Sequence, residues 1–160
     1  MVYDELTAEE NLLLFARLQG TADAAKRVDQ LLAEVGLLER RGSLVRTFSR
    51  GMRQRVAIAR ALAQNPEAIL YDEPTTMVDP IMAGHMGDLI SRLKQAFHKT
   101  SIVVTHDTHL AKRLADTVVF LHDGLADVFP TWAGFESSKE PLIQDFLMQD
   151  ELIPALDVTL

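Results

Sequence analysis

Hydrophobic residues recur every three or four positions between residues 8 and 36, and this spacing predicts helical structure. Thr7 and Glu10 have the spacing of a capping box, in which each side chain satisfies a free backbone N–H of the other residue. Gly20 and Gly36 are expected to break or end the helical segments. The apolar positions of the pattern are Leu12, Leu13, Phe15, Ala16, Val28, Leu31, Leu32 and Val35.

A polar and basic connector at residues 40–47 leads to a further predicted helix. Ser49 is the expected N-cap of this helix, which runs to about Gln64. Asn65 and Pro66 end it, because the residue before a proline is driven away from helical backbone angles.

Short apolar runs follow, and each has the length of a buried strand. They lie at residues 68–71, 101–105 and 117–121. Asp79 and Pro80 are the expected N-cap and first residue of a helix that extends to about Phe97. Another helix is expected near residues 108–115.

Asp123 and Gly124 form a strong hairpin signal between the third run and residues 125–129. Residues 130–138 are predicted to be a surface loop packed by its own aromatic side chains, with a partner contact as the alternative. A last amphipathic helix is expected at residues 139–149. The aromatic residues of the predicted loop are Trp132 and Phe135.

The order of these elements predicts an α/β fold. Helices come first, and the strands that follow alternate with helices, which favours a parallel sheet covered by helices. The predicted parts are a helical subdomain at residues 1–65, half of a sheet core at residues 66–129 and a C-terminal extension at residues 130–160.

The composition is that of an ordinary globular domain, with 160 residues, 48% hydrophobic and 24% charged. A net charge of −7 argues against a general nucleic-acid binder, although a local basic patch lies between Arg40 and Arg60. The absence of cysteine excludes a disulfide framework and a thiolate metal site. Because no apolar run approaches the ~18 residues of a membrane span, we expect a soluble chain whose membrane role would go through a partner.

Two pairs of residues could carry phosphate chemistry. Ser49 and Gly51 open a helix, where free N–H groups and the helix dipole favour an anion and the glycine allows close approach of a phosphate. The alternative there is a capped helix with a basic face. Asp72 and Glu73 end a predicted strand, so one could hold Mg²⁺ while the other orients or deprotonates a water. The alternative is a polar strand end before a turn.

His106 directly follows the predicted strand at residues 101–105, at the edge of the sheet where α/β proteins bind ligands. Its imidazole could donate to a γ-phosphate or hold a water against Glu73, and the alternative is a capping histidine. The other histidines lack zinc-ligand spacing and are assigned to surface or loop positions. They are His85, His98, His109 and His122.

In their order and spacing, these motifs resemble the ATP-binding-cassette (ABC) ATPase family. FSRGMRQRVAIARAL is similar to its signature motif and helix, ILYDEPTT to Walker B, MVDP to the D-loop and VVTHD to the switch region. The match extends to about Gly124. The resemblance implies a partial P-loop NTPase (RecA-like) core with a parallel sheet, an N-terminal α-helical signature subdomain, and ATP and Mg²⁺ as cofactors.

The resemblance also implies a role for each matched residue. Ser49 and Gly51 would contact the γ-phosphate held by the opposite subunit of a head-to-tail dimer. Arg50 and Met52 belong to the same nucleotide-binding motif, where they replace the usual glycine and glutamine. The other implied roles are Mg²⁺ support at Asp72, the catalytic base at Glu73, the dimer interface at Asp79 and the γ-phosphate switch at His106.

Two further departures from the family pattern affect the expected activity. Met77 and Val78 replace a glycine and a leucine, and a positive φ at Met77 would cost on the order of 1 kcal/mol or more. No G-x-x-x-x-G-K-[ST] occurs, so the Walker A part is missing and the chain is expected to begin in mid-domain. The isolated fragment is therefore expected to be inactive. A truncated gene or a mis-called start codon would produce it, and a split protein is the alternative.

The partners implied are transmembrane transporter subunits and a second ATPase subunit, with the chain peripheral on the cytoplasmic face of the cell membrane. The first half is similar to exporter-type ATPases, including haem exporters. The second half is similar to MCE/Mla-type lipid-trafficking ATPases, which makes lipid transport the leading expectation. The alternative function is a truncated or regulatory fragment that docks on a partner without hydrolysing ATP.

Overall fold

The structure is a computed structural model that describes residues 2–76 and 78–151 of the chain. It divides into two compact units, Met1–Val104 and Thr105–Leu160. The part boundaries predicted at residues 65 and 129 remain predictions.

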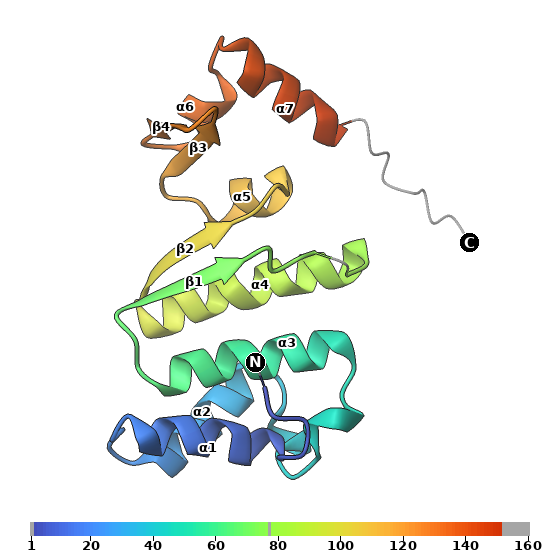
Figure 1. The fold of residues 1–160 in the computed structure, drawn as a ribbon, viewed down its shortest axis with the longest axis vertical. Coiled ribbons are helices and arrows are strands. Elements are labelled where there is room, and N and C mark those ends of the chain that lie inside the picture. The colour runs from blue at the N-terminus through green and yellow to red at the C-terminus, as the bar shows by residue number, and fades with distance from the viewer. Residues whose placement is uncertain (1, 77, 152–160) are drawn as a thin grey trace, which may run out of the picture. The chain divides into compact units, whose positions relative to one another are not determined.

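Three helices open the first unit (Figure 1): α1 (Ala8–Leu18), α2 (Ala24–Glu34) and α3 (Arg50–Ala63). Two short 3₁₀ turns, η1 (Leu38–Arg40) and η2 (Val45–Thr47), lie between α2 and α3. The three helices contact one another and bury a shared set of apolar side chains. The buried side chains of this part include Leu12, Ala16, Val28, Leu31, Leu32, Val45, Val56, Ala59 and Leu62.

The predicted ends of these helices are confirmed by their capping residues. The Thr7 N–H donates to Glu10 Oε2 at 2.8 Å, and the Glu10 N–H donates to Thr7 Oγ1 at 3.1 Å, which completes the expected capping box. Gly20 and Gly36 have φ values of 65° and 68°, a left-handed conformation that ends a helix without a steric penalty. The segment 8–36 is therefore two helices interrupted at the predicted glycines.

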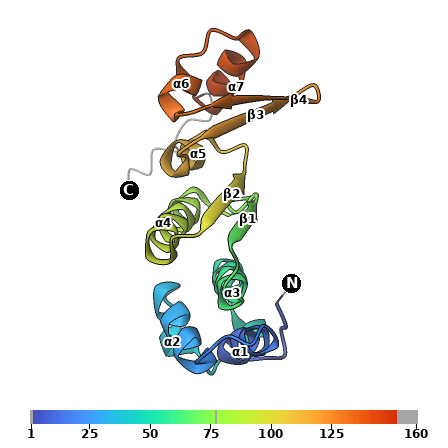
Figure 2. The ribbon, with the colours of Figure 1, turned by 90° about the vertical axis from the view of Figure 1, so that its left-hand side faces the viewer.

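A parallel strand pair follows the three helices. β1 (Ala68–Asp72) and β2 (Thr100–Val104) are joined by α4 (Pro80–Phe97), and Asp72 lies opposite Val104 in the register. Figure 2 shows α4 alongside the two strands. The buried side chains of β1 and α4 include Ile69, Tyr71, Met86, Leu89, Ile90 and Leu93.

The prediction that these strands are buried is wrong for one of their two faces. Side chains alternate across a strand, and only every second residue of β1 is buried. Leu70 is 64% exposed and Ile102 is 55% exposed, because they point away from the face that contains Ile69 and Tyr71. Composition predicted strands covered on both sides, whereas this chain buries one side of β1 and half-buries one side of β2.

The second unit contains the hairpin of β3 (Val118–His122) and β4 (Leu125–Phe129), preceded by α5 (Thr108–Leu114). The predicted hairpin turn is confirmed, because Asp123 and Gly124 have positive φ values of 47° and 77°. The expectation that this third strand extends a parallel sheet is wrong in the part of the chain that the structure describes. There β3 pairs with β4 in antiparallel fashion, because a two-residue turn brings neighbouring strands together.

The loop predicted at residues 130–138 contains a short helix, α6 (Trp132–Glu136), so this prediction is wrong in part. Thr131 Oγ1 accepts a hydrogen bond from the Gly134 N–H at 3.1 Å and caps the helix. Phe135, only 2% exposed, packs with its ring centroid 5.3 Å from that of Trp132, so the expected aromatic packing is confirmed. The final helix, α7 (Pro141–Glu151), begins two residues later than expected.

Candidate functional site

The start of α3 has the character of an anion site. Ser49 is the N-cap, and its Oγ accepts a hydrogen bond from the Met52 N–H at 3.3 Å, which confirms the predicted cap. Ser49 and Arg50 are exposed, and the first turn carries no acidic side chain. Free N–H groups, the helix dipole and an arginine therefore face the same end of the helix without a competing carboxylate.

Gly51 has a packing role that the sequence analysis did not identify. It is buried, and a Cβ atom added to it would lie 2.6 Å from Met82 Cε of α4. Such a distance is too short for two carbon atoms, so the glycine leaves room for the end of the Met82 side chain between α3 and the first turn of α4. The absence of a side chain at residue 51 therefore serves helix packing as well as any approach by a phosphate.

The end of β1 presents two carboxylates in different backbone conformations. Asp72 is the exposed last residue of the strand, and Glu73 has a φ of 46°. Left-handed backbone angles cost a non-glycine residue about 1 kcal/mol or more. The Glu73 N–H donates to the Val104 carbonyl at 2.9 Å, and Thr76 Oγ1 donates to Glu73 Oε2 at 3.2 Å. These contacts hold Glu73 in this unfavourable conformation and orient its carboxylate.

A side chain from α3 connects the helix to the segment after β1. Gln54 Nε2 donates to the Pro74 carbonyl oxygen at 3.4 Å, two residues beyond the strand. A cavity of about 230 Å³ lies between α3 and the strand. Its lining includes Gln54, Ala57, Ile58, Tyr71, Asp72 and Glu73. The two carboxylates thus border a hollow that the helix beginning at Ser49 helps to form.

The start of α4 lies just beyond this segment. Asp79 Oδ1 accepts a hydrogen bond from the Met82 N–H at 2.9 Å, and Pro80 is the first helical residue, as predicted. Asp79 itself is exposed. Met77 lies outside the described residues, so the strain predicted at that position remains a prediction.

His106 belongs to the second unit, so its distance from Glu73 remains a prediction. It is exposed and follows Val104, the last residue of β2, by two positions. The next residue, Asp107, caps α5 by accepting a hydrogen bond from the Leu110 N–H at 2.9 Å. The capping role considered for His106 thus belongs to its neighbour Asp107.

Arg53 and Gln54 were not singled out by the sequence analysis. Their position in the sequence could have indicated these contacts. They follow the helix N-cap by four and five residues, where side chains can reach back towards the preceding loop or across to a neighbouring strand.

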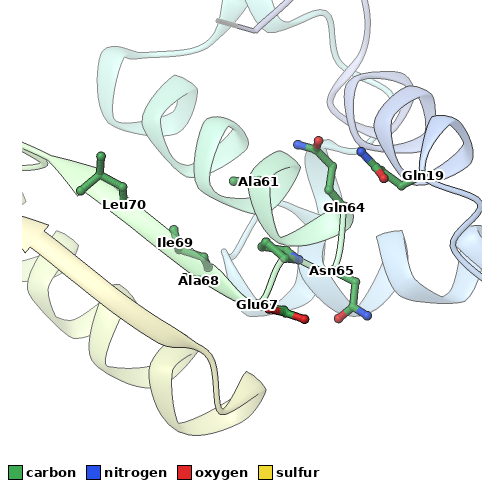
Figure 3. Close-up of a pocket in the computed structure, with 9 residues that line it drawn as sticks. Gln19, Ala61, Gln64, Asn65, Glu67, Ala68, Ile69 and Leu70 are labelled. Carbon is green, nitrogen blue, oxygen red and sulfur yellow. The ribbon is translucent and has the colours of Figure 1, made fainter.

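A separate hollow of about 480 Å³ lies at the beginning of β1, at the opposite end of the strand from Asp72. Figure 3 shows Gln19, Gln64, Asn65 and Glu67 among its lining residues. Its ionisable lining consists of the Glu67 carboxylate. No feature of the sequence indicated this cavity.

Across residues 2–76 and 78–151, we find no cluster of three histidine, aspartate or glutamate side chains suited to a metal ion. An Mg²⁺ ion that keeps water and phosphate ligands needs only one or two protein carboxylates, and the exposed Asp72 fits that requirement. In the same residues, each helix is too short or too polar to cross a membrane.

Comparison with known proteins supports the family resemblance. The family model described as ABC transporter matches residues 1–76. The chain is 35% identical over 150 residues to the L-cystine transport system ATP-binding protein TcyN of Escherichia coli. It is 40% identical over 126 residues to the arginine transport ATP-binding protein ArtM of Bacillus subtilis, and 43% identical over 122 residues to a fluoroquinolones export ATP-binding protein of Mycobacterium tuberculosis.

These alignments cover most of this chain but only part of each relative. They include 91%, 78% and 76% of the chain, and 60%, 52% and 40% of the respective relatives. The names of these relatives refer to amino acids and a drug class. They give no support to the expected lipid-trafficking or haem-exporter subgroup, which stays a prediction.

Proposed function

We propose that this chain is part of an ABC transporter ATP-binding protein and supplies the signature helix and the hydrolytic carboxylates of an ATP-hydrolysing transporter subunit. The observation that carries this proposal is the arrangement around α3. A capped, acid-free helix start at Ser49 and a strand end at Asp72 and Glu73 belong to one unit, connected through the contact between Gln54 and Pro74.

Ser49 and Gly51 bind the γ-phosphate of an ATP molecule held by a second ATPase subunit. Their N–H groups lie in the first turn of α3, where the helix dipole stabilises negative charge. The side chains of Arg50 and Met52 flank this turn, and Arg50 adds a positive charge beside the phosphate. A second subunit in head-to-tail orientation places the phosphate at this surface.

Asp72 holds the Mg²⁺ ion, and Glu73 accepts a proton from the attacking water. Mg²⁺ neutralises the charge that develops on the phosphate oxygens during hydrolysis. Thr76 Oγ1 donates a hydrogen bond to Oε2 of Glu73, and this bond fixes the orientation of the carboxylate. His106 contacts the γ-phosphate, and Asp79 lies at the interface between the two ATPase subunits.

Hydrolysis also needs a phosphate loop, and no G-x-x-x-x-G-K-[ST] occurs in these 160 residues. We therefore expect a polypeptide of these residues to have no ATPase activity above background. In the whole transporter, the membrane subunits bind this ATPase at the inner face of the membrane and use the closure of its dimer to drive transport.

The transported substrate is selected outside the residues shared with the relatives. Proteins whose names refer to cystine, arginine and fluoroquinolones are 35–43% identical to the same stretch of this chain. Because one stretch of sequence accompanies such different solutes, it serves the use of ATP rather than the choice of substrate.

The test joins the phosphate-loop part of ArtM to the N-terminus of this chain and measures ATP turnover. Glu73→Gln should lower turnover by about 100-fold or more while ATP binding persists, because a general base contributes roughly 10²–10⁴ to the rate. Glu67→Gln is the matched control, since Glu67 is exposed just before the other end of β1, and it should retain activity. Turnover that survives Glu73→Gln would contradict the assignment of the base.

A further inference from the structure

Arg53 lies in the first turns of α3, and its guanidinium has three oxygen partners. Nε donates to the Phe48 carbonyl at 3.2 Å, and Nη2 donates to the Arg46 carbonyl at 2.9 Å. Nη1 donates to Asp4 Oδ2 at 3.4 Å. One planar group therefore joins the helix to two carbonyls and to a carboxylate from the beginning of the chain.

Two of the three partners belong to the segment that leads to Ser49, and the third is attached to it. Arg46 and Phe48 lie three residues and one residue before Ser49. Asp4 is attached to the same segment through its backbone, because the Arg46 N–H donates to the Asp4 carbonyl at 3.1 Å. Arg53 thus fixes the path of the backbone immediately before the serine.

This path decides where the Ser49 hydroxyl lies. Ser49 has an extended backbone with a ψ of 164°, while the following residue is helical, so the chain turns sharply at the N-cap. The side chain of Phe48 is buried and anchors the segment. Burial of this side chain does not by itself orient the Phe48 carbonyl group, which needs a hydrogen-bond partner. The Nε group of Arg53 supplies such a partner.

We propose that Arg53 is a positioning residue for the phosphate-binding turn, which holds the backbone of residues 46–48 so that Ser49 and the first N–H groups of α3 face the nucleotide of the second subunit. This inference rests on the proposed function. A lysine cannot replace the arginine, because a single ammonium group lacks the rigid fork that reaches two carbonyls and a carboxylate together.

The first experiment tests the contact without ATP. Amide hydrogen exchange is measured on the 160-residue chain as wild type, Arg53→Met, Arg53→Lys and Arg92→Met. Arg53→Met should speed exchange in peptides covering residues 44–52 by about tenfold or more, since hydrogen bonds to a charged group are lost. Arg53→Lys should restore part of the protection. Arg92 is an exposed arginine of α4, and its replacement controls for the loss of charge.

Two outcomes of this experiment would overturn the inference. One is exchange within about twofold of wild type in the Arg53→Met chain, which would mean that the guanidinium does not hold the segment. The other is faster exchange throughout α1, α2 and α3, which would indicate general loss of structure. If Arg53→Met does not fold, Arg53→Lys decides: exchange in residues 44–52 should still be faster than in wild type, and exchange equal to wild type would overturn the inference.

The second experiment uses the polypeptide that carries the ArtM phosphate loop. Arg53→Met should lower kcat about tenfold or more and change KM for ATP by less than about threefold, because the turn meets ATP held by the other subunit. If Ser49→Ala abolishes turnover while Arg53→Met leaves it intact, the positioning role is wrong. If Ser49→Ala has no effect on turnover, the proposed phosphate-binding role of this turn is wrong. The exchange experiment would still test the contact of Arg53, because it does not depend on ATP.

Discussion

The helical part of the first unit, residues 2–65, closes its own core, whereas the strand part, residues 66–104, does not. Leu12 and Leu31 are 0% exposed, and their neighbours come from α1, α2 and α3. In the strand part, Leu70 and Ile102 are large apolar side chains that remain mostly exposed. Both parts are rich in hydrophobic residues, so composition does not explain the difference.

The difference follows from how helices and strands bury their side chains. Each of the three helices places one apolar stripe inside the bundle and leaves its other side to polar residues. The two strands are apolar on both faces, and α4 covers one of them. A pair of strands cannot close a core by itself and needs a layer on each apolar face. The helical part should therefore carry most of the stability of this chain.

The largest expected effect compares two leucines directly. Leu31→Ala should lower the free energy of unfolding by about 2–5 kcal/mol, because it leaves a cavity in the closed core. Leu70→Ala, the same chemical change on the bare face of β1, should lower it by less than about 0.5 kcal/mol. Urea denaturation of the 160-residue chain measures both. Equal losses would show that the strand part has a closed core of its own.

The second effect concerns the contact between the two parts at Gly51 and Met82. Gly51→Ala should change the stability of the chain by less than about 1 kcal/mol, because the added methyl group meets the flexible end of the Met82 side chain, which can turn aside, and alanine has the higher helix propensity. In a Met82→Ala background, the methyl group has room, and the same change should stabilise the chain. Denaturation of the four variants gives this double-mutant cycle. An effect of the same size in both backgrounds would exclude any packing role of the contact.

The third effect isolates the backbone conformation at the end of β1. Glu73→Gly should be more stable than Glu73→Ala by about 1 kcal/mol, because both changes remove the contact with Thr76 and only glycine tolerates a φ of 46° without cost. Thermal unfolding of the two variants measures this difference. Equal stability of the two variants would mean that the left-handed backbone at residue 73 carries no steric cost for alanine.

The smallest effect lies in the helical part and depends on pH. Arg41 Nε donates to Glu9 Oε2 at 3.0 Å, and this hydrogen bond lowers the pKa of Glu9 below 4.5. A carboxyl group with a lowered pKa in the folded state adds stability above its unfolded-state value, and this stability is lost as pH falls through the lowered value. The stability difference between wild type and Arg41→Met should therefore shrink between about pH 7 and about pH 3. If the difference in urea midpoint between wild type and Arg41→Met stays constant over this pH range, Arg41 stabilises the chain through packing rather than through its charge.

Local signals predicted the helix ends because capping is a matter of neighbouring residues. Thr7, Ser49 and Asp79 each accept a backbone N–H within three positions, as their sequence context indicated. The hairpin at Asp123 and Gly124 was predictable for the same reason, since two residues define its turn. The order of motifs likewise indicated the resemblance to the ABC ATPase family that the comparisons support.

Long-range features of the fold were not predictable from these signals. Exposure of one strand face and the short helix α6 both depend on which elements meet in space. At the site, the left-handed backbone of Glu73 depends on its hydrogen bond to Val104, which is distant in sequence. The roles of Arg53 and Gly51 depend in the same way on residues 4 and 82.

The sequence by itself determined where the helices begin and end and which family the chain resembles, and it predicted which residues carry phosphate chemistry. These properties depend on residues a few positions apart, or on the order of motifs along the chain. Only the tertiary structure decided which faces are buried and which side chains hold the site in position. Burial and positioning depend on contacts between residues far apart along the chain, such as that between Asp4 and Arg53, and no local pattern encodes which partner will be there.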